Sequence, residues 1–450
     1  MTTLIPKFDL KNGGATPTGA INRTIYEKLS DMISVKDFGA VGNGTTDDTV
    51  AIQAALTVGG SILVPAGTYK ITADLIIGDN TNVNFATGSG FIAGANNITF
   101  FKSTTHAYGG QIHNAVLDGN GYTGVTGFDL TNFRLHAGIF NAYMSVLEYG
   151  FIGRDGCFGL LISNPTAYGV KYPIVFIANN SNAEIFNPIF DNSVIAGGDG
   201  TGTGVTIQFG SGSNLGARVV GGYIQGFTLG IDDAAIGTMV EGTYFEACTD
   251  VDITANTTAR NGKYINTEHW ATVGSACYRF RNTDAMVVQF PTMGSGARTQ
   301  VFDVDATNSN CKGYITQSNA SFNYPIGTIT GILLSGYTQF FNVLDGSGAG
   351  LTFTQNATAY WSISDNVVTL TGDITYPVTA SGANATLALP IAAKASSSVN
   401  GCVGYTTFGS LLTMTGGASA IGFYAAGGGV YTNANLSAKR FAFSITYIAN

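Results

Sequence analysis

The sequence predicts an all-β protein, a parallel β-helix (solenoid) of short strands followed by an antiparallel β domain. Three observations support this. Only 11% of the 450 residues are charged while 61 are glycine, which is typical of a chain with many tight turns. From about residue 60 to 290, short apolar runs alternate with Gly, Asn and Asp without helical periodicity. Part of this region repeats at intervals of roughly 20 residues, which favours a solenoid over a sandwich or a barrel.

The repeat is clearest in the middle of the chain. "GGYIQGFT" (221–228) aligns with "GTYFEACT" (242–249) at an offset of 21, and "TYFEA" (243–247) aligns with "KYINT" (263–267) at an offset of 20. "PIFDN" (188–192) fits the same pattern at an offset of 34, because the insertion "AGGDGTGTG" lengthens that interval. We therefore expect each repeat to be one coil of three short strands.

A short cap helix is expected over residues 47–58, ahead of the first coils. "TTDDT" precedes "VAIQAAL", so that Thr46 or Asp47 suits the N-cap position and the acidic residues suit the positive end of the helix dipole. The same role explains Asp47 and Asp48 better than metal or phosphate binding does. A helix here would cover the open end of the solenoid. Its apolar stripe is predicted to consist of Val50, Ala51, Ala54, Ala55 and Val58.

The composition and the strand pattern of the sequence change along the chain, and these changes predict four segments. Towards the C-terminus the strands become longer and alternate more regularly, as in "NVVTLTGDITYPV" and "KRFAFSITYIAN". Such a domain would also cover the far end of the solenoid. We expect an anchor or lead-in segment over residues 1–30, the solenoid with its cap helix over 31–290, a transition segment over 291–325 and a β-sandwich over 326–450.

Charge and composition exclude several classes of function. A net charge of −8 without clustered Lys or Arg argues against a nucleic-acid partner. No apolar run has the length of a membrane span, and the N-terminus "MTTLIPKFDL" lacks the features of a secretory signal. The histidines (His106, His113, His136 and His269) show no metal-ligand spacing, so no metal or organic cofactor is predicted. The cysteines are expected to be buried, reduced thiols: Cys157, Cys248, Cys277, Cys311 and Cys402.

Alternation along the repeated strands predicts which side chains face outward. Apolar residues at positions 190, 224, 245 and 265 are expected to point inward. Stacked outward tyrosines suit a sugar-binding groove, because pyranose rings place their C–H faces on aromatic rings. An aromatic ladder that only stabilises the sheet is the alternative. The predicted outward columns are Ile189, Tyr223, Tyr244 and Tyr264, and beside them Asp191, Gln225, Glu246 and Asn266, with Trp270 just beyond.

Glycoside hydrolysis needs two carboxyl groups, one to protonate the leaving oxygen and one to activate water or attack the sugar. Glu246 lies in the outward column and is the first candidate. Asp191 lies two coils away, about 9–10 Å at about 4.8 Å per strand, close to the upper limit of the inverting range of about 6.5–9.5 Å. The other candidate catalytic partners are Asp232, Asp233 and Glu241. The substrate-binding candidates are Tyr223, Gln225, Tyr244, Tyr264, Glu268 and Trp270.

Three motifs resemble a known family. "VKDFGAVGNGTTDDTVAIQAAL" followed by "ILVPAGTYKIT", about residues 34–72, resembles the opening of the pectate-lyase-like superfamily found in bacteriophage tailspikes. The leader "LIPKFDLKNGGATPTGAINR" resembles the N-terminal anchors of such tail proteins, and "VEGTYFEACTDVDI" resembles their coils. The resemblance implies a right-handed parallel β-helix, a homotrimer, and a virion protein that binds and often cuts bacterial surface polysaccharide. It also implies that residues 1–30 join the phage tail or another spike, that the C-terminal domain trimerises and can bind glycan, and that a neighbouring chain can supply the second carboxylate.

Two other functions stay open. A polysaccharide lyase would need a base and a cation to neutralise a uronate, for which His269, Arg279 and Arg281 are the candidates. A non-catalytic receptor-binding spike could use the same fold and groove without any chemistry. The release of new reducing ends from host polysaccharide would distinguish these functions from hydrolysis.

Overall fold

The computed structural model describes residues 7–8, 23–24, 27–28 and 31, and the chain from residue 33 onward with short gaps. These gaps are 135, 178–179, 194–197, 209–215, 257–258, 271–273, 294–299, 306, 318–326, 330–331, 341–342, 390–398, 407–411, 417–419, 426–427 and 449–450. Near the N-terminus, β1 (Lys7–Phe8) pairs with β2 (Arg23–Thr24) in antiparallel orientation. The rest of the predicted anchor segment, residues 1–30, lies almost entirely outside the described residues. The chain divides into two compact units, residues 1–253 and 254–450.

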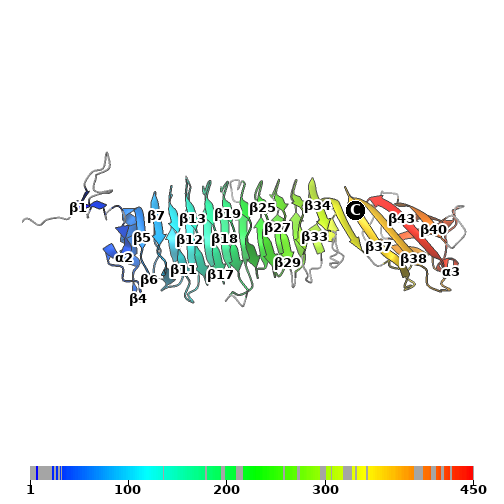
Figure 1. Ribbon diagram of the computed structural model, residues 1–450, viewed down its shortest axis with the longest axis horizontal. Coiled ribbons are helices and arrows are strands. Elements are labelled where there is room, and N and C mark those ends of the chain that lie inside the picture. Colours follow the sequence, from blue (N-terminus) through cyan, green and yellow to red (C-terminus); the bar gives the residue numbers. More distant parts are fainter. Residues whose placement is uncertain are drawn as a thin grey trace, which may run out of the picture. The chain divides into compact units, whose positions relative to one another are not determined.

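In the first unit, each coil contains up to three short strands, and successive coils pair in parallel (Figure 1). The first strands form sheet one: β3 (Ile33–Ser34), β5 (Gly60–Val64), β7 (Thr81–Phe85), β10 (Gln111–His113), β13 (Gly138–Phe140), β16 (Leu161–Ser163), β19 (Glu184–Phe186), β22 (Arg218–Val220) and β25 (Met239–Glu241). The second strands form sheet two: β4 (Asn43–Asp47), β6 (Gly67–Ile71), β8 (Ser89–Ala93), β11 (Val116–Asp118), β14 (Tyr143–Ser145), β17 (Thr166–Tyr168), β20 (Ile189–Asp191), β23 (Tyr223–Gln225) and β26 (Tyr244–Glu246). The third strands form sheet three: β9 (Thr99–Lys102), β12 (Thr126–Thr131), β15 (Tyr149–Arg154), β18 (Tyr172–Ile177), β21 (Thr203–Gln208), β24 (Leu229–Asp233) and β27 (Val251–Asn256). The parallel β-solenoid predicted from the sequence is confirmed.

The interior of these coils is a continuous apolar core. In the three-residue strands of sheet two, the central side chain is buried, and its two neighbours therefore face outward. Rings from successive coils also stack, as Phe101 does on Phe128 with centroids 5.4 Å apart. Each such side chain contributes about 1.5–3 kcal/mol when it is fully buried. The inward positions predicted at Phe190, Ile224 and Phe245 are confirmed.

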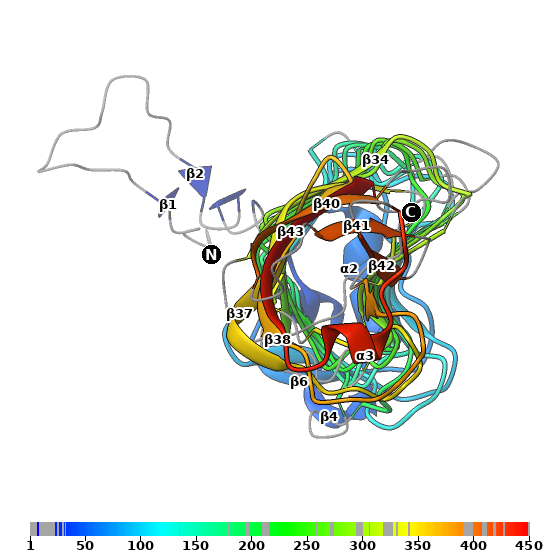
Figure 2. The same ribbon diagram turned by 90° about the vertical axis from the view of Figure 1, so that its right-hand side faces the viewer.

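The cap helix is α2 (Thr49–Val58), and it lies at the N-terminal end of the coils, within their outline when they are viewed end-on (Figures 1 and 2). The predicted apolar stripe was wrong, because Val50 is 80% exposed and Val58 is 60% exposed. The helix instead turns its larger side chains inward, since these bury more apolar area than the alanines on which the prediction relied. The buried residues of α2 are Thr49, Ile52, Ala55 and Leu56.

The two aspartates before α2 organise the chain that leads into it. Asp48 occupies the N-cap position, but its carboxylate accepts hydrogen bonds from the amides of Val41, at 2.6 Å, and Gly42, at 3.1 Å. Asp47 accepts from the Thr49 amide at 3.0 Å and from the Thr72 hydroxyl at 2.7 Å. Both carboxylates therefore fix local structure. A short 3-10 helix, η1 (Val35–Phe38), precedes this segment.

Asparagines line the corner between sheets one and two. Asn114, Asn141, Asn164 and Asn187 all adopt left-handed backbone conformations, with φ between 48° and 57°. The side-chain amides of Asn141, Asn164 and Asn187 donate to the amide oxygen of the asparagine one coil before, at 3.1, 3.0 and 3.3 Å respectively. This asparagine ladder holds successive corners in register, because it pairs polar groups that the sharp turn leaves outside the sheets.

The second unit contains further coils and then an antiparallel domain. Parallel pairing joins β28 (Lys263–Ile265), β31 (Val287–Gln289) and β34 (Cys311–Gln317); β29 (Glu268–Trp270) and β32 (Thr292–Met293); and β30 (Ala276–Arg281), β33 (Gln300–Val304) and β35 (Gly327–Ile329). The antiparallel strands pair in the order β36 (Ile332–Phe340), β37 (Thr354–Ser364), β38 (Val367–Thr375), β43 (Arg440–Ile448), β40 (Val399–Thr406), β41 (Leu412–Gly416), β42 (Ala420–Ala425) and β39 (Thr386–Ala388). The antiparallel domain has its own buried core, and helix α3 (Asn433–Leu436) belongs to it. The boundaries predicted near residues 291 and 326 stay predictions.

One repeat was aligned wrongly. "KYI" is β28, a first strand, and the strand that corresponds to β26 in its coil is β29. Tyr264 is consequently fully buried and Ile265 is half-buried, which reverses the predicted orientations of both residues. The predicted offset of 20 residues ends one strand too early, because the strand equivalent to β26 in the next coil begins at Glu268 and not at Tyr264.

Cys157, Cys248, Cys277 and Cys311 are buried, as predicted, and burial raises the pKa of the Cys157 thiol to about 12. The side chain of Cys402 lies outside the described residues. None of the helices in the described part of the chain has the length and hydropathy of a membrane-crossing segment.

Candidate functional site

The outward face of sheet two carries a continuous set of tyrosines and acidic or amide side chains. Strict pairing of β14, β17, β20, β23 and β26 aligns their residues in two columns. Tyr223 is paired with Tyr244 in one column, and Asp191, Gln225 and Glu246 follow one another in the other. We call the outward set the tyrosine–carboxylate strip. Its members are Tyr143, Tyr168, Asp191, Tyr223, Gln225, Tyr244 and Glu246.

Direct contacts connect the members of the strip. The Tyr244 hydroxyl donates to Oε2 of Glu246 at 2.9 Å. The rings of Tyr143 and Tyr168 lie 5.9 Å apart between centroids at an angle of 46°, and Tyr143 is 40% exposed. Oδ1 of Asp191 accepts a hydrogen bond from the Ser193 amide at 2.9 Å. The strip thus presents exposed aromatic surface together with two carboxylates that are held in place by neighbouring donors.

Tyr223 lies at the centre of the strip. Burial raises the pKa of its phenol, and a hydrogen bond with the Tyr168 side chain and the charges of Asp191 and Glu246 raise the pKa further. The phenol therefore stays protonated at neutral pH and can act as a hydrogen-bond donor. Tyr223 lies on β23, the strand between those that carry Asp191 and Glu246.

Glycines on both sides of β23 allow this arrangement. Gly222 has φ +71°, and a Cβ atom there would lie 2.1 Å from the carbonyl oxygen of Pro188. Gly226 has φ +74°, and a Cβ atom there would lie 2.5 Å from the amide nitrogen of Ser193. The backbones of neighbouring coils therefore approach closely at both ends of the strand. This close approach brings Tyr223 and Gln225 between the two carboxylates.

A sequence model described as "Rhamnogalacturonase A/epimerase, pectate lyase-like" matches residues 32–285. This range is more than half of the chain. The chain belongs to this pectate lyase-like family. A tail spike protein of an Escherichia phage is 44% identical over 55 residues, which are 12% of this chain and 7% of that protein. The mannuronan C5-epimerase AlgE5 of Azotobacter vinelandii is 50% identical over 44 residues, 9% of this chain and 4% of the epimerase.

The fold of this pectate lyase-like chain extends beyond these short matches. A tailspike protein of the E. coli bacteriophage HK620 superposes with a TM-score of 0.50 at 11% identity, over 98% of this chain and 97% of that one. At this identity the likeness concerns the fold. The matched segments of the two curated relatives are a small part of their lengths, so their whole-protein activities are not transferred.

Three predicted catalytic partners lie outside the strip of this pectate lyase-like protein. Glu241 is on β25 in sheet one, where its Oε2 lies 3.2 Å from a guanidinium nitrogen of Arg218. Asp232 is half-buried on β24 in sheet three. Asp233 is fully buried beside it, and its carboxylate accepts from the Ala235 amide at 2.9 Å and the Thr238 hydroxyl at 2.8 Å. The bonds of Asp233 stabilise a turn, and of the predicted partners the structure brings Asp191 together with Glu246.

The remaining predicted sugar contacts belong to the second unit. Glu268 and Trp270 occupy the outward positions of β29, where the indole Nε1–H donates to Oε1 of Glu268 at 2.6 Å. Trp270 is 36% exposed. Tyr264, by contrast, is buried in the core and cannot contact a ligand at the surface.

The side chains proposed for lyase chemistry are engaged in the second unit. His269 is buried at the inward position of β29, and its Nε2 lies 2.7 Å from the Tyr278 hydroxyl and 3.0 Å from that of Thr267. Arg279 donates to Asp303 at 2.9 Å, and Arg281 contacts the same carboxylate. These contacts give His269 and both arginines structural roles.

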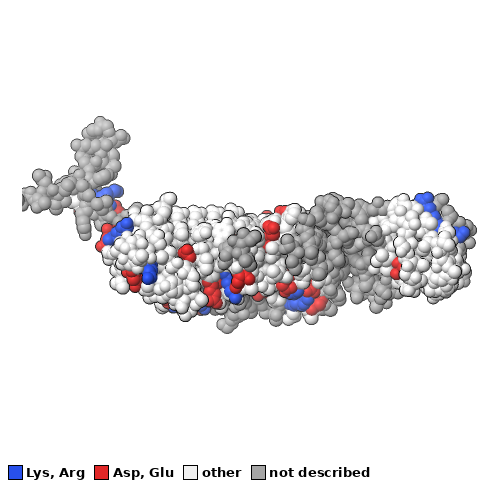
Figure 3. All heavy atoms as spheres, turned by 90° about the horizontal axis from the view of Figure 1, so that it is seen from below, with Lys and Arg blue, Asp and Glu red and all other residues white. Residues whose placement is uncertain are grey.

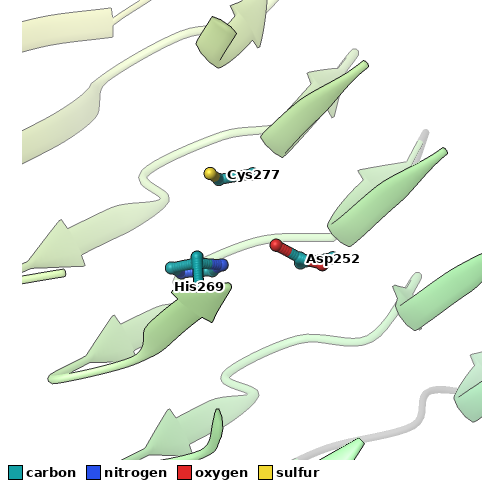
Figure 4. A group of neighbouring side chains, drawn as sticks. All are labelled: Asp252, His269 and Cys277. Atoms are coloured by element: carbon teal, nitrogen blue, oxygen red, sulfur yellow. The ribbon is translucent and has the colours of Figure 1, made fainter. Parts of the chain in front are cut away.

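Figure 4 shows His269, Cys277 and Asp252, the last of which belongs to β27. The possible ligand atoms of His269 and Cys277 lie within 4.8 Å of each other. All three residues are buried. Their positions in the sequence show no metal-ligand spacing, which is why the sequence did not reveal the His269–Cys277 pair. Because His269 already has hydroxyl partners and thiols are common core residues, we assign the pair to the core.

Sequence reasoning missed Tyr168. "TAY" contains an alanine at its inward position, and it therefore lacks the large apolar residue that marked the other strands. The spacing from Tyr168 to Asp191 would have revealed it, since the two residues are direct partners in β17 and β20.

Figure 3, which views the side on which β11 and β17 lie in Figure 1, shows few charged side chains, in small groups among uncharged ones.

Proposed function

We propose that this protein is a phage tail protein that binds a bacterial surface polysaccharide along the tyrosine–carboxylate strip and cleaves it by hydrolysis. One observation carries the proposal: Asp191 and Glu246 face outward on the same column, two strands apart, with Gln225 between them. Membership of the pectate lyase-like family and the tailspike fold support a role in acting on polysaccharide.

The spacing of the two carboxylates suits an inverting mechanism. Two steps of about 4.8 Å separate their strands by about 9–10 Å, at the upper limit of the range of about 6.5–9.5 Å that leaves room for a water molecule. One carboxyl group would protonate the leaving oxygen, and the other would activate the water on the opposite face of the sugar. The Tyr244 hydroxyl orients the Glu246 carboxylate on the strip, and we assign Glu246 as the base and Asp191 as the acid.

The tyrosines of the strip would bind the glycan on either side of the cleavage point. The exposed Tyr143 ring and the half-buried Tyr168 ring lie together on the N-terminal side of Asp191. Sugar rings pack their C–H faces on such rings, while hydroxyl groups bond to the polar rim formed by Tyr223 and Gln225. The strip thus offers several contacts in a row, which suits a polymer better than a single sugar.

The charge of the strip favours hydrolysis over elimination. None of its described residues is Lys or Arg, and its two carboxylates would repel a uronate at the reacting position. A lyase needs a cation or metal ion to neutralise that uronate. Cleavage is therefore expected at a neutral sugar. A trimeric assembly and attachment to the tail through residues 1–30 belong to the same proposal.

The test is the chemistry of the product. Purified protein is incubated with capsule and O-antigen polysaccharides from candidate hosts, and new reducing ends and unsaturated products are measured separately. We expect reducing ends without unsaturated sugar, and we expect Glu246→Gln to abolish them while glycan binding is retained. Glu184→Gln, the same substitution on the outward face of sheet one, is the matched control and should cleave normally. Unsaturated products would show a lyase, and binding without any product would show a receptor-binding spike.

A further inference from the structure

A stack of rings around one guanidinium lies on the corners that lead from sheet three to sheet one. Tyr108, Arg134 and Phe158 come from three successive corners of the first unit. The guanidinium carbon of Arg134 lies 5.0 Å from the centroid of the Tyr108 ring and 5.4 Å from that of Phe158. The backbone fixes this arrangement, since the Gly109 amide donates to the carbonyl oxygen of Arg134 at 2.9 Å.

The charge of Arg134 is not neutralised by a carboxylate. Its Nη2 donates to the Tyr108 hydroxyl at 3.0 Å, and its Nε is buried without a hydrogen-bond partner. Among the described residues, no acidic side chain forms an ion pair with it. An unpaired buried donor is costly, and such groups commonly mark the place of an unseen water or ion. The guanidinium has five N–H donors, so Nη donors besides the one bonded to Tyr108 can serve an anionic group.

Asp79, the acidic residue beside Tyr108, is already engaged. Oδ1 of Asp79 lies 2.7 Å from Nδ1 of His106 and accepts from the Tyr108 amide at 2.8 Å. The His106 ring stacks on Tyr108 with centroids 4.7 Å apart. The histidine and the amide thus hold the Asp79 carboxylate beside Tyr108.

Phe158 supplies the second half of a binding site. It is 39% exposed although it is a large apolar residue. An exposed ring beside a guanidinium matches a sugar that carries a carboxylate, because the ring takes the C–H face and the planar fork takes the acid. We propose that Tyr108, Arg134 and Phe158 bind an acidic sugar residue. In the coils this corner lies between sheets three and one, whereas the strip is on sheet two, so the site is separate and does not depend on the proposed hydrolysis.

The experiment is a titration of the full chain with D-glucuronate, followed by ligand-observed NMR, with D-glucose and acetate as comparison ligands. We expect glucuronate to bind at least about tenfold more tightly than either, because only glucuronate offers both the ring and the carboxylate. Arg134→Gln should weaken glucuronate binding at least about tenfold, and Phe158→Ala should also weaken it. Arg154→Gln removes one positive charge from the neighbouring strand β15 and is the matched control.

Arg134→Lys is a second variant that distinguishes weaker binding from a folding defect. It keeps the positive charge but loses the planar guanidinium. With a thermal unfolding transition like that of the wild type, it should still bind more weakly than the wild type. Equal binding of acetate and glucuronate, or unchanged glucuronate binding in the folded Arg134→Gln variant, would overturn the proposal. Loss of cleavage in the Glu246→Gln variant with glucuronate binding intact would show that this site does not depend on the proposed hydrolytic site.

Discussion

The Tyr244 hydroxyl donates a 2.9 Å hydrogen bond to Oε2 of Glu246, two residues further along the same strand. Successive side chains of a strand point to opposite faces, so residues two apart share a face, and here that face is the outward one. The bond holds the carboxylate on the same face as the tyrosine ring.

Tyr244→Phe should therefore lower kcat/KM for polysaccharide cleavage by about tenfold to hundredfold, the usual effect of losing one hydrogen bond to a charged group. The decrease should be mainly in kcat, because the ring that contacts sugar is retained. Initial rates over a range of polysaccharide concentrations measure it. Tyr172→Phe, the same change on sheet three, is the control. A full rate in Tyr244→Phe would show that Glu246 needs no such support.

The Tyr168 side chain beside Tyr223 predicts a shift in the titration of Tyr223. Since the Tyr168 side chain raises the pKa of Tyr223, Tyr168→Phe should lower that pKa towards the ordinary value for tyrosine. Asp191→Asn should lower it as well, because a negative charge near the phenol is removed. NMR titration of protein with 13C-labelled tyrosine measures the effect, and Tyr223→Phe assigns the signal. A pKa of Tyr223 that is unchanged in both variants would contradict the described geometry of the strip.

The asparagine ladder predicts a specific loss of stability. Asn164 donates to Asn141 and accepts from Asn187, so its removal breaks two hydrogen bonds. Asn164→Gly keeps the left-handed conformation accessible but deletes both bonds, and should lower the free energy of unfolding by about 1–3 kcal/mol. Asn182→Gly is the control, because Asn182 has φ +53° and lies outside the ladder. Chemical denaturation measures both, and equal losses would assign the effect to glycine itself.

Asp303 predicts an acid-sensitive contribution to stability. Burial alone would raise the pKa of its carboxyl group, but hydrogen bonds from Arg281 and Arg279 outweigh burial and lower it. This contribution is fully present above the unfolded pKa of about 3.9 and is lost as the pH falls through the lower folded pKa. Asp303→Asn should thus cost about 1–3 kcal/mol at pH 7, since all three side chains are partly exposed.

The test for Asp303 is urea unfolding of the wild type and of Asp303→Asn from pH 7 down to pH 3. The difference between the two free energies of unfolding should shrink below about pH 4. A difference that stays constant over this range would mean that the arginines do not stabilise the ionised carboxylate.

Local alternation allowed the sequence to predict most of the strip, because a buried Phe190, Ile224 or Phe245 requires its neighbours to face outward. The prediction failed at Tyr264. The three-residue strands resemble one another and the corners between them vary in length, so the alignment matched Tyr264 to the wrong strand of its coil. The contacts of Tyr223 could not be predicted either. They depend on how the side chains of three successive coils meet, and spacing along one strand carries no information on that.

The sequence also could not predict which of the candidate acids lies on an open face of the coils. Asp233, Glu241 and Glu246 each occupy the last position of a short strand, so their places along the chain look alike. Only the fold separates a buried carboxylate bonded to Thr238, or one paired with Arg218, from one on an open face.

The anomeric configuration of the first product tests the central claim most directly. Time-resolved NMR of the wild-type reaction on a susceptible polysaccharide, read before mutarotation equilibrates the new reducing end, reports that configuration. Carboxylates of Asp191 and Glu246 placed two strands apart predict inversion. A product with retained configuration would require a pair about 5–5.5 Å apart and would contradict the assignment of these two residues.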